Sequence, residues 1–329
     1  MREHSSATIE KRPPVLPHQG NGIWWGLLGV VAFSFTVPFT RVAVASLSPL
    51  FIGSGRAVIA GILAGAALVL TRQRLPSAAI LARLALVAGG VVIGFPFLTS
   101  FALTDVPASH GAVVIALLPA ATATAAILRT GERPPTTFWL VIALGSLAAV
   151  GFAFLQSGGA GQWRWADLLL LGAVVSAAIG YAEGGLLARE IGSWQTIAWA
   201  LILALPLMLL LAGIAAAAQP PVATPVQWAA FGYLAVVSMF LGFLAWYRGL
   251  AIGPIARVSQ IQLIQPVLSI CWAALLLGEA LPWTTWVGGL AVVACAGAAV
   301  RVRLGSPSPN SSPSPNSSPS PKSSPTPTR

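Results

Sequence analysis

The chain has 329 residues, of which 56% are hydrophobic and only 8% are charged, and its mean hydropathy is +0.82. A soluble domain carries about 25% charged residues, so this composition excludes a water-soluble globular protein and favours segments that cross a lipid bilayer. The net charge of +10 does not indicate a nucleic-acid partner, because the arginines stand singly or in pairs between apolar runs and form no basic stripe.

Ten apolar stretches follow one another along the chain. Each is long enough to cross a bilayer at about 1.5 Å of rise per residue, and backbone groups in lipid must bond within their own segment, as they do in helices. We therefore predict an all-α membrane protein with ten transmembrane helices. The stretches are Ile23–Ala45, Pro49–Leu70, Leu81–Phe101, Ala108–Leu128, Thr137–Leu155, Ala166–Leu187, Gln195–Ala217, Val226–Trp246, Ile255–Leu277 and Thr285–Val300.

Two polar tails flank these stretches. Residues 1–22 are polar and rich in proline, and residues 301–329 end in a Ser/Pro repeat, so both tails are predicted to be disordered. With the N-terminus inside, all of the 18 Lys and Arg residues except Arg41, Arg56 and Arg164 fall on the inner side. Because inner loops carry the excess of positive charge, we expect both termini in the cytoplasm.

An internal repeat divides the chain. The segment from Leu118-Pro119 to Gly131-Glu132 recurs as Gln265-Pro266 to Gly278-Glu279, and the same offset of 147 residues relates Pro107 to Pro254 and Leu103 to Leu250. We predict two homologous halves, 23–155 and 156–300, with five helices each. Because five is odd, the second half must enter the membrane upside down. Inverted repeats place a substrate site near the midplane, between the halves.

These features resemble the EamA-type transporters of the drug/metabolite transporter superfamily. The resemblance rests on Arg41, Arg56, Ala102-Leu103 and the paired Pro…Gly-Glu motifs. It implies ten helices in two inverted halves, no nucleotide hydrolysis, and movement of small metabolites, often amino acids that leave the cell. Many relatives have Glu before the proline of the ninth helix, where this chain has Gln265, which argues against a proton-carrying role at that position.

The expected function is therefore that of a secondary transporter working by alternating access in a bacterial inner membrane, exporting amino acids or related metabolites. One alternative is a transporter with a different substrate, a multidrug or nucleobase permease. An alternative of a different functional class is a channel or membrane receptor. The chain shows no buried catalytic constellation and no phosphate-binding loop, so we expect neither an enzyme nor a primary pump. Cys271 and Cys295 lie in apolar runs, so we expect no metal and no cofactor.

The expected partners are a small-molecule substrate and the lipid bilayer, for a monomer or homodimer. Gln260, Gln262 and Gln265 stand together in the ninth stretch, where amides are costly in hydrocarbon and should face a partner or a wet cavity. Neutral amides suit zwitterionic or uncharged polar ligands. The alternative is that they join helices to one another.

Two charged residues lie inside apolar stretches. Glu183 is predicted to form an inner-gate ion pair with Arg248 or Arg257. The alternatives are that it couples protons or binds a ligand amine, or that its side chain extends to the membrane interface. Arg56 lies about 10 Å below the start of its helix. It either holds a substrate carboxylate or pairs with Asp105 as scaffold.

The remaining candidate residues are aromatic, imidazole and proline side chains. Tyr181 and Trp272 are predicted to wall the substrate pocket, with plain packing as the alternative. His110 opens the fourth helix as a structural residue or a proton relay. Pro119 and Pro266 interrupt equivalent helices and are predicted to act as hinges or to shape the cavity.

Overall fold

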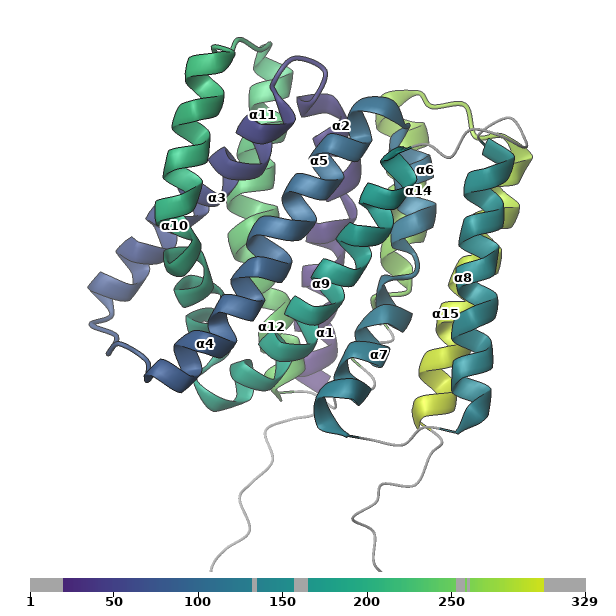
Figure 1. The fold of residues 1–329 in the computed structure, drawn as a ribbon, viewed down its shortest axis with the longest axis horizontal. Helices are drawn as coiled ribbons and strands as arrows, with labels where there is room; N and C mark the ends of the chain where they lie inside the picture. Colours follow the sequence, from purple (N-terminus) through teal and green to yellow (C-terminus); the bar gives the residue numbers. More distant parts are fainter. Residues whose placement is uncertain (1–19, 132–134, 157–164, 253–257, 259–260, 305–329) are drawn as a thin grey trace, which may run out of the picture.

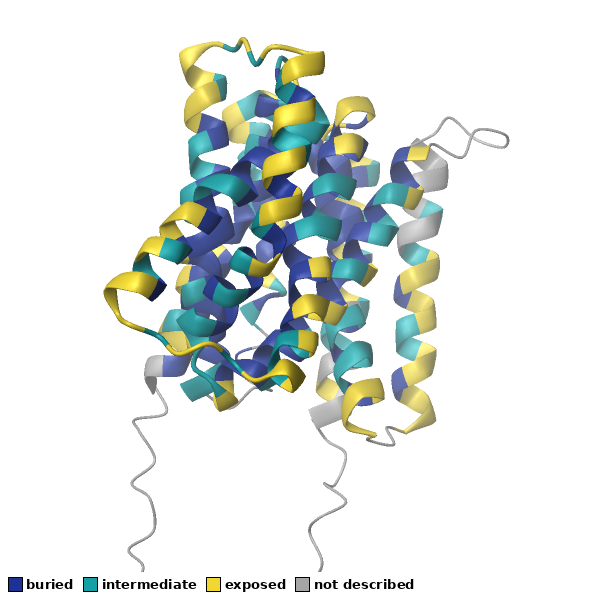
Figure 2. Ribbon diagram, turned by 60° about the vertical axis from the view of Figure 1, so that its left-hand side comes forward, coloured by how far each residue is buried: buried dark blue, intermediate teal, exposed yellow. Residues whose placement is uncertain are grey.

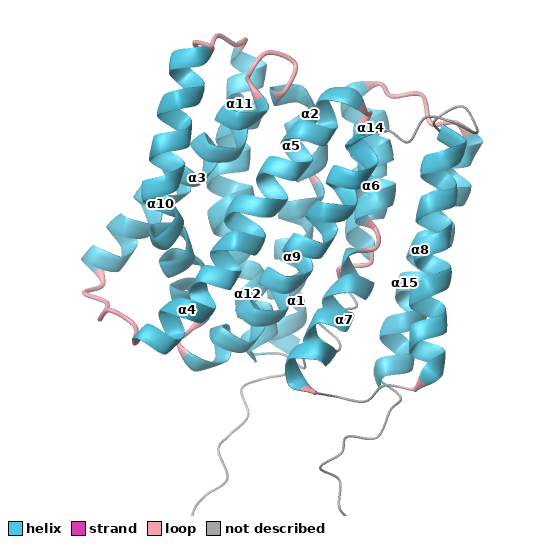
Figure 3. Ribbon diagram, viewed as in Figure 1, coloured by secondary structure: helices cyan, strands magenta, loops and turns pink. Residues whose placement is uncertain are grey.

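Helices joined by short connections make up the described part of this computed structural model, residues 20–131, 135–156, 165–252, 258 and 261–304, and no strand occurs there (Figure 3). The helices, two of them π-helical and labelled η, are α1 Gly20–Ser34, α2 Thr36–Ala43, α3 Pro49–Leu70, α4 Ala78–Val87, η1 Ala88–Gly94, α5 Phe95–Asp105, α6 Ala108–Ile115, α7 Leu118–Thr130, α8 Thr136–Gln156, α9 Trp165–Glu190, α10 Ser193–Ala218, α11 Pro225–Tyr233, η2 Leu234–Leu241, α12 Gly242–Ile252, α14 Ile264–Leu277 and α15 Trp283–Leu304.

Seven helical segments are long and apolar enough to cross a membrane, which supports the predicted membrane class. They are Gly22–Ala43, Pro49–Leu70, Ala78–Asp105, Ala108–Thr130, Trp165–Glu190, Ser193–Ala218 and Pro225–Ile252. Three further apolar helices are shorter within the described residues: Thr136–Ala148, Ile264–Leu277 and Trp283–Cys295. The predicted total of ten crossings stays a prediction.

Local structure repeats at the offset seen in the sequence. Gly131 ends α7 with φ of 71° and Gly278 ends α14 with φ of 64°, a left-handed conformation that glycine adopts without strain. The π-helical segments also correspond, since η1 ends at Gly94 and η2 ends 147 residues later at Leu241. Figure 1 shows α7 ending at the lower face and α14 ending at the upper face, so these equivalent helices run in opposite directions.

Symmetry-related helices also contact one another. Contacts join α3 to α10 and α8 to α15, which correspond at the offset of 147 residues. Helix α6 also contacts α14, and α9 packs against α4, η1, α5, α6 and α7. Buried residues fill the middle of the bundle, and exposed residues lie mainly on its outer faces and at its two ends (Figure 2). Helix α9 is therefore the main contact of the second half with the first.

The predicted tails fall largely outside the described residues. The described ends of these tails are helical and not disordered as predicted: α1 begins at Gly20, and α15 continues to Leu304. Arg301 is exposed near the end of α15, and a long arginine side chain lets a helix extend beyond its apolar stretch.

Candidate substrate site

A small cavity lies where the two halves meet. Its lining comes from helices of both halves, and the π-helical segments η1 and η2 both contribute, as such segments often do at functional sites. It encloses about 20 Å³, which is room for about one water molecule. That volume leaves no room for a metabolite at this point. The lining residues are Phe33, Thr36, Arg56, Val91, Phe95, Ala177, Tyr181, Ser238, Met239, Phe243 and Gln265.

Arg56 brings an uncompensated charge to this cavity. Its side chain is among the largest that are fully buried, with 1% of the residue exposed, and its Nε and Nη1 atoms have no hydrogen-bond partner among the described residues. The predicted pairing with Asp105 is not found, because Asp105 is exposed at the end of α5. An isolated buried charge is costly unless an anion joins it, so Arg56 is ready to bind one.

A second, smaller cavity of about 10 Å³ adjoins the first at Gln265. Both amide atoms of Gln262 and the Oε1 atom of Gln265 are buried without a hydrogen-bond partner in the described part of the chain. Each such atom costs about 1–3 kcal/mol. The lining residues are Val37, Ala112, Ile115, Leu118, Pro119, Gln262, Gln265, Pro266 and Ser269.

Broken helices shape this second cavity. Helix α6 ends at Ile115 and α7 begins at Leu118, while α14 begins at Ile264, and Pro119 and Pro266 stand just inside the new helices. Proline has no N–H to donate to the carbonyl four residues earlier, so the helix is interrupted there. Both prolines predicted to shape the cavity therefore line it, while their action as hinges stays a prediction.

The wall of the first cavity is largely aromatic. The ring of Phe33 lies 4.9 Å from that of Phe243, edge to face, and 6.3 Å from the ring of Tyr181. A hydroxyl pair, Thr36 Oγ1 and Ser238 Oγ at 2.8 Å, joins the two halves beside these rings. The described lining thus combines one cation, neutral polar groups and an apolar face, with no acid among its residues.

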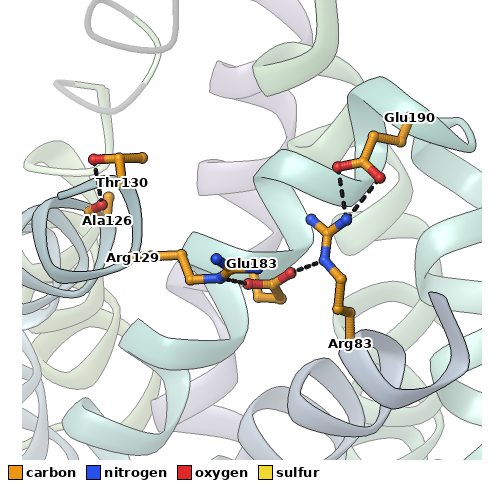
Figure 4. Close-up of polar contacts among 6 residues, drawn as sticks. All are labelled: Arg83, Ala126, Arg129, Thr130, Glu183 and Glu190. Atoms are coloured by element: carbon orange, nitrogen blue, oxygen red, sulfur yellow. Dashed lines mark hydrogen bonds and ion pairs between the residues drawn. The ribbon is translucent and has the colours of Figure 1, made fainter. Parts of the chain in front are cut away.

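Glu183 lies in a different place, toward the C-terminal end of α9, and Figure 4 shows its contacts. Arg83 and Arg129 approach its carboxylate from opposite sides, with Arg129 Nε at 2.6 Å, and Arg83 also binds Glu190 at 2.6 Å. The prediction that Arg248 pairs with Glu183 was wrong, because the guanidinium of Arg248 instead lies 4.9 Å from the centre of the Trp25 ring. The other predicted partner, residue 257, is outside the described residues. Through these ion pairs, Glu183 joins α4 and α7 of the first half to α9.

The opposite end of the bundle is fastened as well. His110 Nε2 lies 2.6 Å from Asp167 Oδ1, and both side chains are buried. The carboxylate of Glu279, in the connection after α14, accepts hydrogen bonds from the backbone N–H groups of Ala108 at 2.7 Å and Ser109 at 2.9 Å. A carboxylate at a helix N-terminus satisfies donors that the helix itself leaves unpaired. Helix α6 is therefore fixed to the second half at two points.

Besides the two prolines, the structure brings together four of the residues predicted to bind substrate: Arg56, Tyr181, Gln262 and Gln265. Trp272 lies beside them but lines neither cavity, since its ring stacks on Phe35 at 4.6 Å and its Nε1 donates to Ser34 Oγ. The site excludes Glu183 and His110, and Gln260 is outside the described residues.

Several lining residues were not predicted from the sequence, among them Phe33, Phe243, Ser238 and Met239. Apolar residues in an apolar helix carry no signal of which face they occupy. Asp167 lies in the first turn of α9, and only the fold places it against His110.

Comparisons with known proteins agree with this architecture. Residues 20–154 and 164–300 each match the EamA-like transporter family. A relative from Bacillus subtilis (strain 168), named "Uncharacterized transporter YdeK", is 45% identical over 289 residues, covering 85% of this chain and 97% of that protein. A solved crystal structure at 18% identity covers 87% of this chain and 99% of its own with a TM-score of 0.60, which shows a shared fold.

Proposed function

Because this chain belongs to the EamA-like transporter family, we propose that it is a secondary transporter that exports small carboxylate metabolites, amino acids among them, by alternating access. The observation that carries the proposal is Arg56, a buried cation that faces the cavity between the halves without a carboxylate partner among the described residues. A planar guanidinium binds a carboxylate through two parallel hydrogen bonds. The aromatic wall then packs against the rest of the substrate.

Alternating access is supported by the contacts at the two ends of the cavity. The cluster of Glu183 with Arg83 and Arg129 joins the halves at one end, and the contacts of Asp167 and Glu279 with α6 join them at the other. Between them the cavity is too small for a metabolite. Transport then requires that one end opens while the other stays fastened.

The proposed setting is a bacterial inner membrane crossed ten times by two inverted halves, in a monomer or homodimer. The positive-inside distribution of Lys and Arg supports cytoplasmic termini. In that orientation the Glu183 cluster is the inner closure and the His110–Asp167 pair lies at the outer closure. The described chain begins and ends at the lower face of Figure 1, which agrees with both termini being on one side.

Substitution of Arg56 tests the proposal. The Arg56→Lys protein is expected to fold and to lose roughly tenfold or more of its kcat/KM for carboxylate substrates, because an ammonium cannot donate the same paired hydrogen bonds. The measurement is counterflow of labelled amino acids and organic acids in proteoliposomes. Arg248→Lys, at an exposed arginine outside both cavities, is the matched control and should transport normally. Carboxylate transport that survives Arg56→Lys unchanged would contradict the proposal.

A further inference from the structure

We propose that Gln262 and Gln265 bind a second polar group of the substrate, a hydrogen-bond donor on the carbon next to its carboxylate, and so determine substrate specificity. This inference rests on the proposed carboxylate site at Arg56. The donor can be an ammonium or a hydroxyl, since an amide oxygen accepts a hydrogen bond from either.

The symmetry of the fold shows that packing does not demand these amides. The residues 147 positions earlier are Ile115 and Leu118, which line the same small cavity from the equivalent broken helix. In the first half, apolar side chains are therefore sufficient to pack the helices at these positions. In the second half the same two positions carry amides, one of which is 2% exposed and the other 6% exposed.

Three of the four polar atoms of these amides do not join helices to one another within the described part of the chain, although joining helices was the alternative explanation for the amides. Neither amide end of Gln262 has a hydrogen-bond partner among the residues that the structure describes, and Gln265 Oε1 has none either. Buried polar groups are nearly always paired. These atoms are therefore complementary to something that enters the cavity.

The position of Gln265 links the amides to Arg56. Gln265 lines both cavities, so it shares one cavity with Arg56 and the other with Gln262. Arginine only donates hydrogen bonds, and the unpartnered oxygens of the two glutamines only accept them. A ligand that satisfies Arg56 and the two oxygens carries a carboxylate for Arg56 and a donor group close beside it. The unpartnered Gln262 Nε2 is a donor, which a carboxylate or hydroxyl oxygen of the same ligand can satisfy. No acid lines either cavity in the described part of the chain, so the unpartnered amide oxygens are candidate acceptors for that donor group.

Three labelled probes that share one apolar body test the inference in proteoliposomes: phenylalanine, phenyllactate and 3-phenylpropanoate. They carry an ammonium, a hydroxyl or only hydrogen on the carbon next to the carboxylate. The unaltered protein is expected to transport at least one of the first two about tenfold or more faster than 3-phenylpropanoate. Whether the ammonium or the hydroxyl is preferred identifies the donor.

Gln265→Met, which keeps the side-chain length but removes the acceptor, is expected to reduce that preference to near equality. Gln262→Met provides a second variant with the same expectation. The matched control is Gln195→Met on α10, because Gln195 Oε1 is also buried without a partner but lines neither cavity. The control should keep the preference of the unaltered protein.

Two results would overturn the inference while leaving the carboxylate site intact. One is equal transport of all three probes by the unaltered protein. The other is a preference that survives in both Gln265→Met and Gln262→Met. Failure of the proposed function looks different, because Arg56→Lys would then leave transport of all three carboxylates unchanged.

Discussion

At the scale of the residue, the role of a buried charged side chain depends on which residues pair with it. Glu183 and Arg56 both lie inside apolar helices. Both were predicted to bind a partner or a substrate because charged residues lie inside an apolar stretch only for such a reason. The fold gives Glu183 two arginines and leaves Arg56 with none among the described residues. The sequence could not choose Arg83 as the partner, because Arg83 is 100 positions away and its closeness depends on how α4 packs on α9.

Glu183→Gln is predicted to loosen the inner closure, because the neutral amide cannot hold both guanidinium groups. A reporter cysteine at Ser238, in a chain whose Cys271 and Cys295 are replaced by alanine, measures opening through its reaction with an impermeant maleimide. Labelling from the inner face should rise by roughly tenfold. Glu190→Gln is the control and should change labelling less, because Glu190 is half-exposed and has one arginine partner, Arg83, among the described residues. Equal effects of the two substitutions would count against a specific role of Glu183 in closure.

At the scale of the element, the sequence predicted helices and their interruptions better than the course of the backbone inside them. Pro119 and Pro266 indicated the two breaks because proline cannot continue the hydrogen-bond ladder. The π-helical turns of η1 and η2 were not predicted, since a run of apolar residues has the same composition in a π-helix as in an α-helix. Only packing at the centre of the bundle shows where the widening occurs.

A close approach of η1 to α9 yields a prediction at this scale. A Cβ atom added at Gly90 would lie 2.9 Å from the backbone N and Cα atoms of Gly180, whereas one added at Gly89 would meet nothing within 4 Å. Gly90→Ala should therefore lower the free energy of unfolding by about 1–3 kcal/mol, and Gly89→Ala should leave it nearly unchanged. Thermal unfolding of both proteins in the same detergent measures the difference. Equal stability would mean that these helices do not approach closely.

At the scale of the whole molecule, the repeated motifs predicted a pair of related segments, and the fold places their equivalent ends on opposite faces (Figure 1). The inverted relation of the two segments can be predicted from the sequence, because motif spacing and loop charge can be read without knowing which residues are in contact. The composition of the cavity does not, since it gathers side chains from nine helical segments. The aromatic wall and the closures at both ends became visible only once those segments were packed together.

The central claim is that the cavity holding Arg56 opens to one face of the membrane at a time. Labelling of the Ser238→Cys reporter by an impermeant maleimide, added separately to right-side-out and inside-out vesicles, tests it most directly. We predict labelling from each face, slower in the presence of a transported carboxylate, with Glu183→Gln shifting the balance toward the inner face. Labelling from a single face, both with Glu183 in place and with glutamine there, would contradict the account.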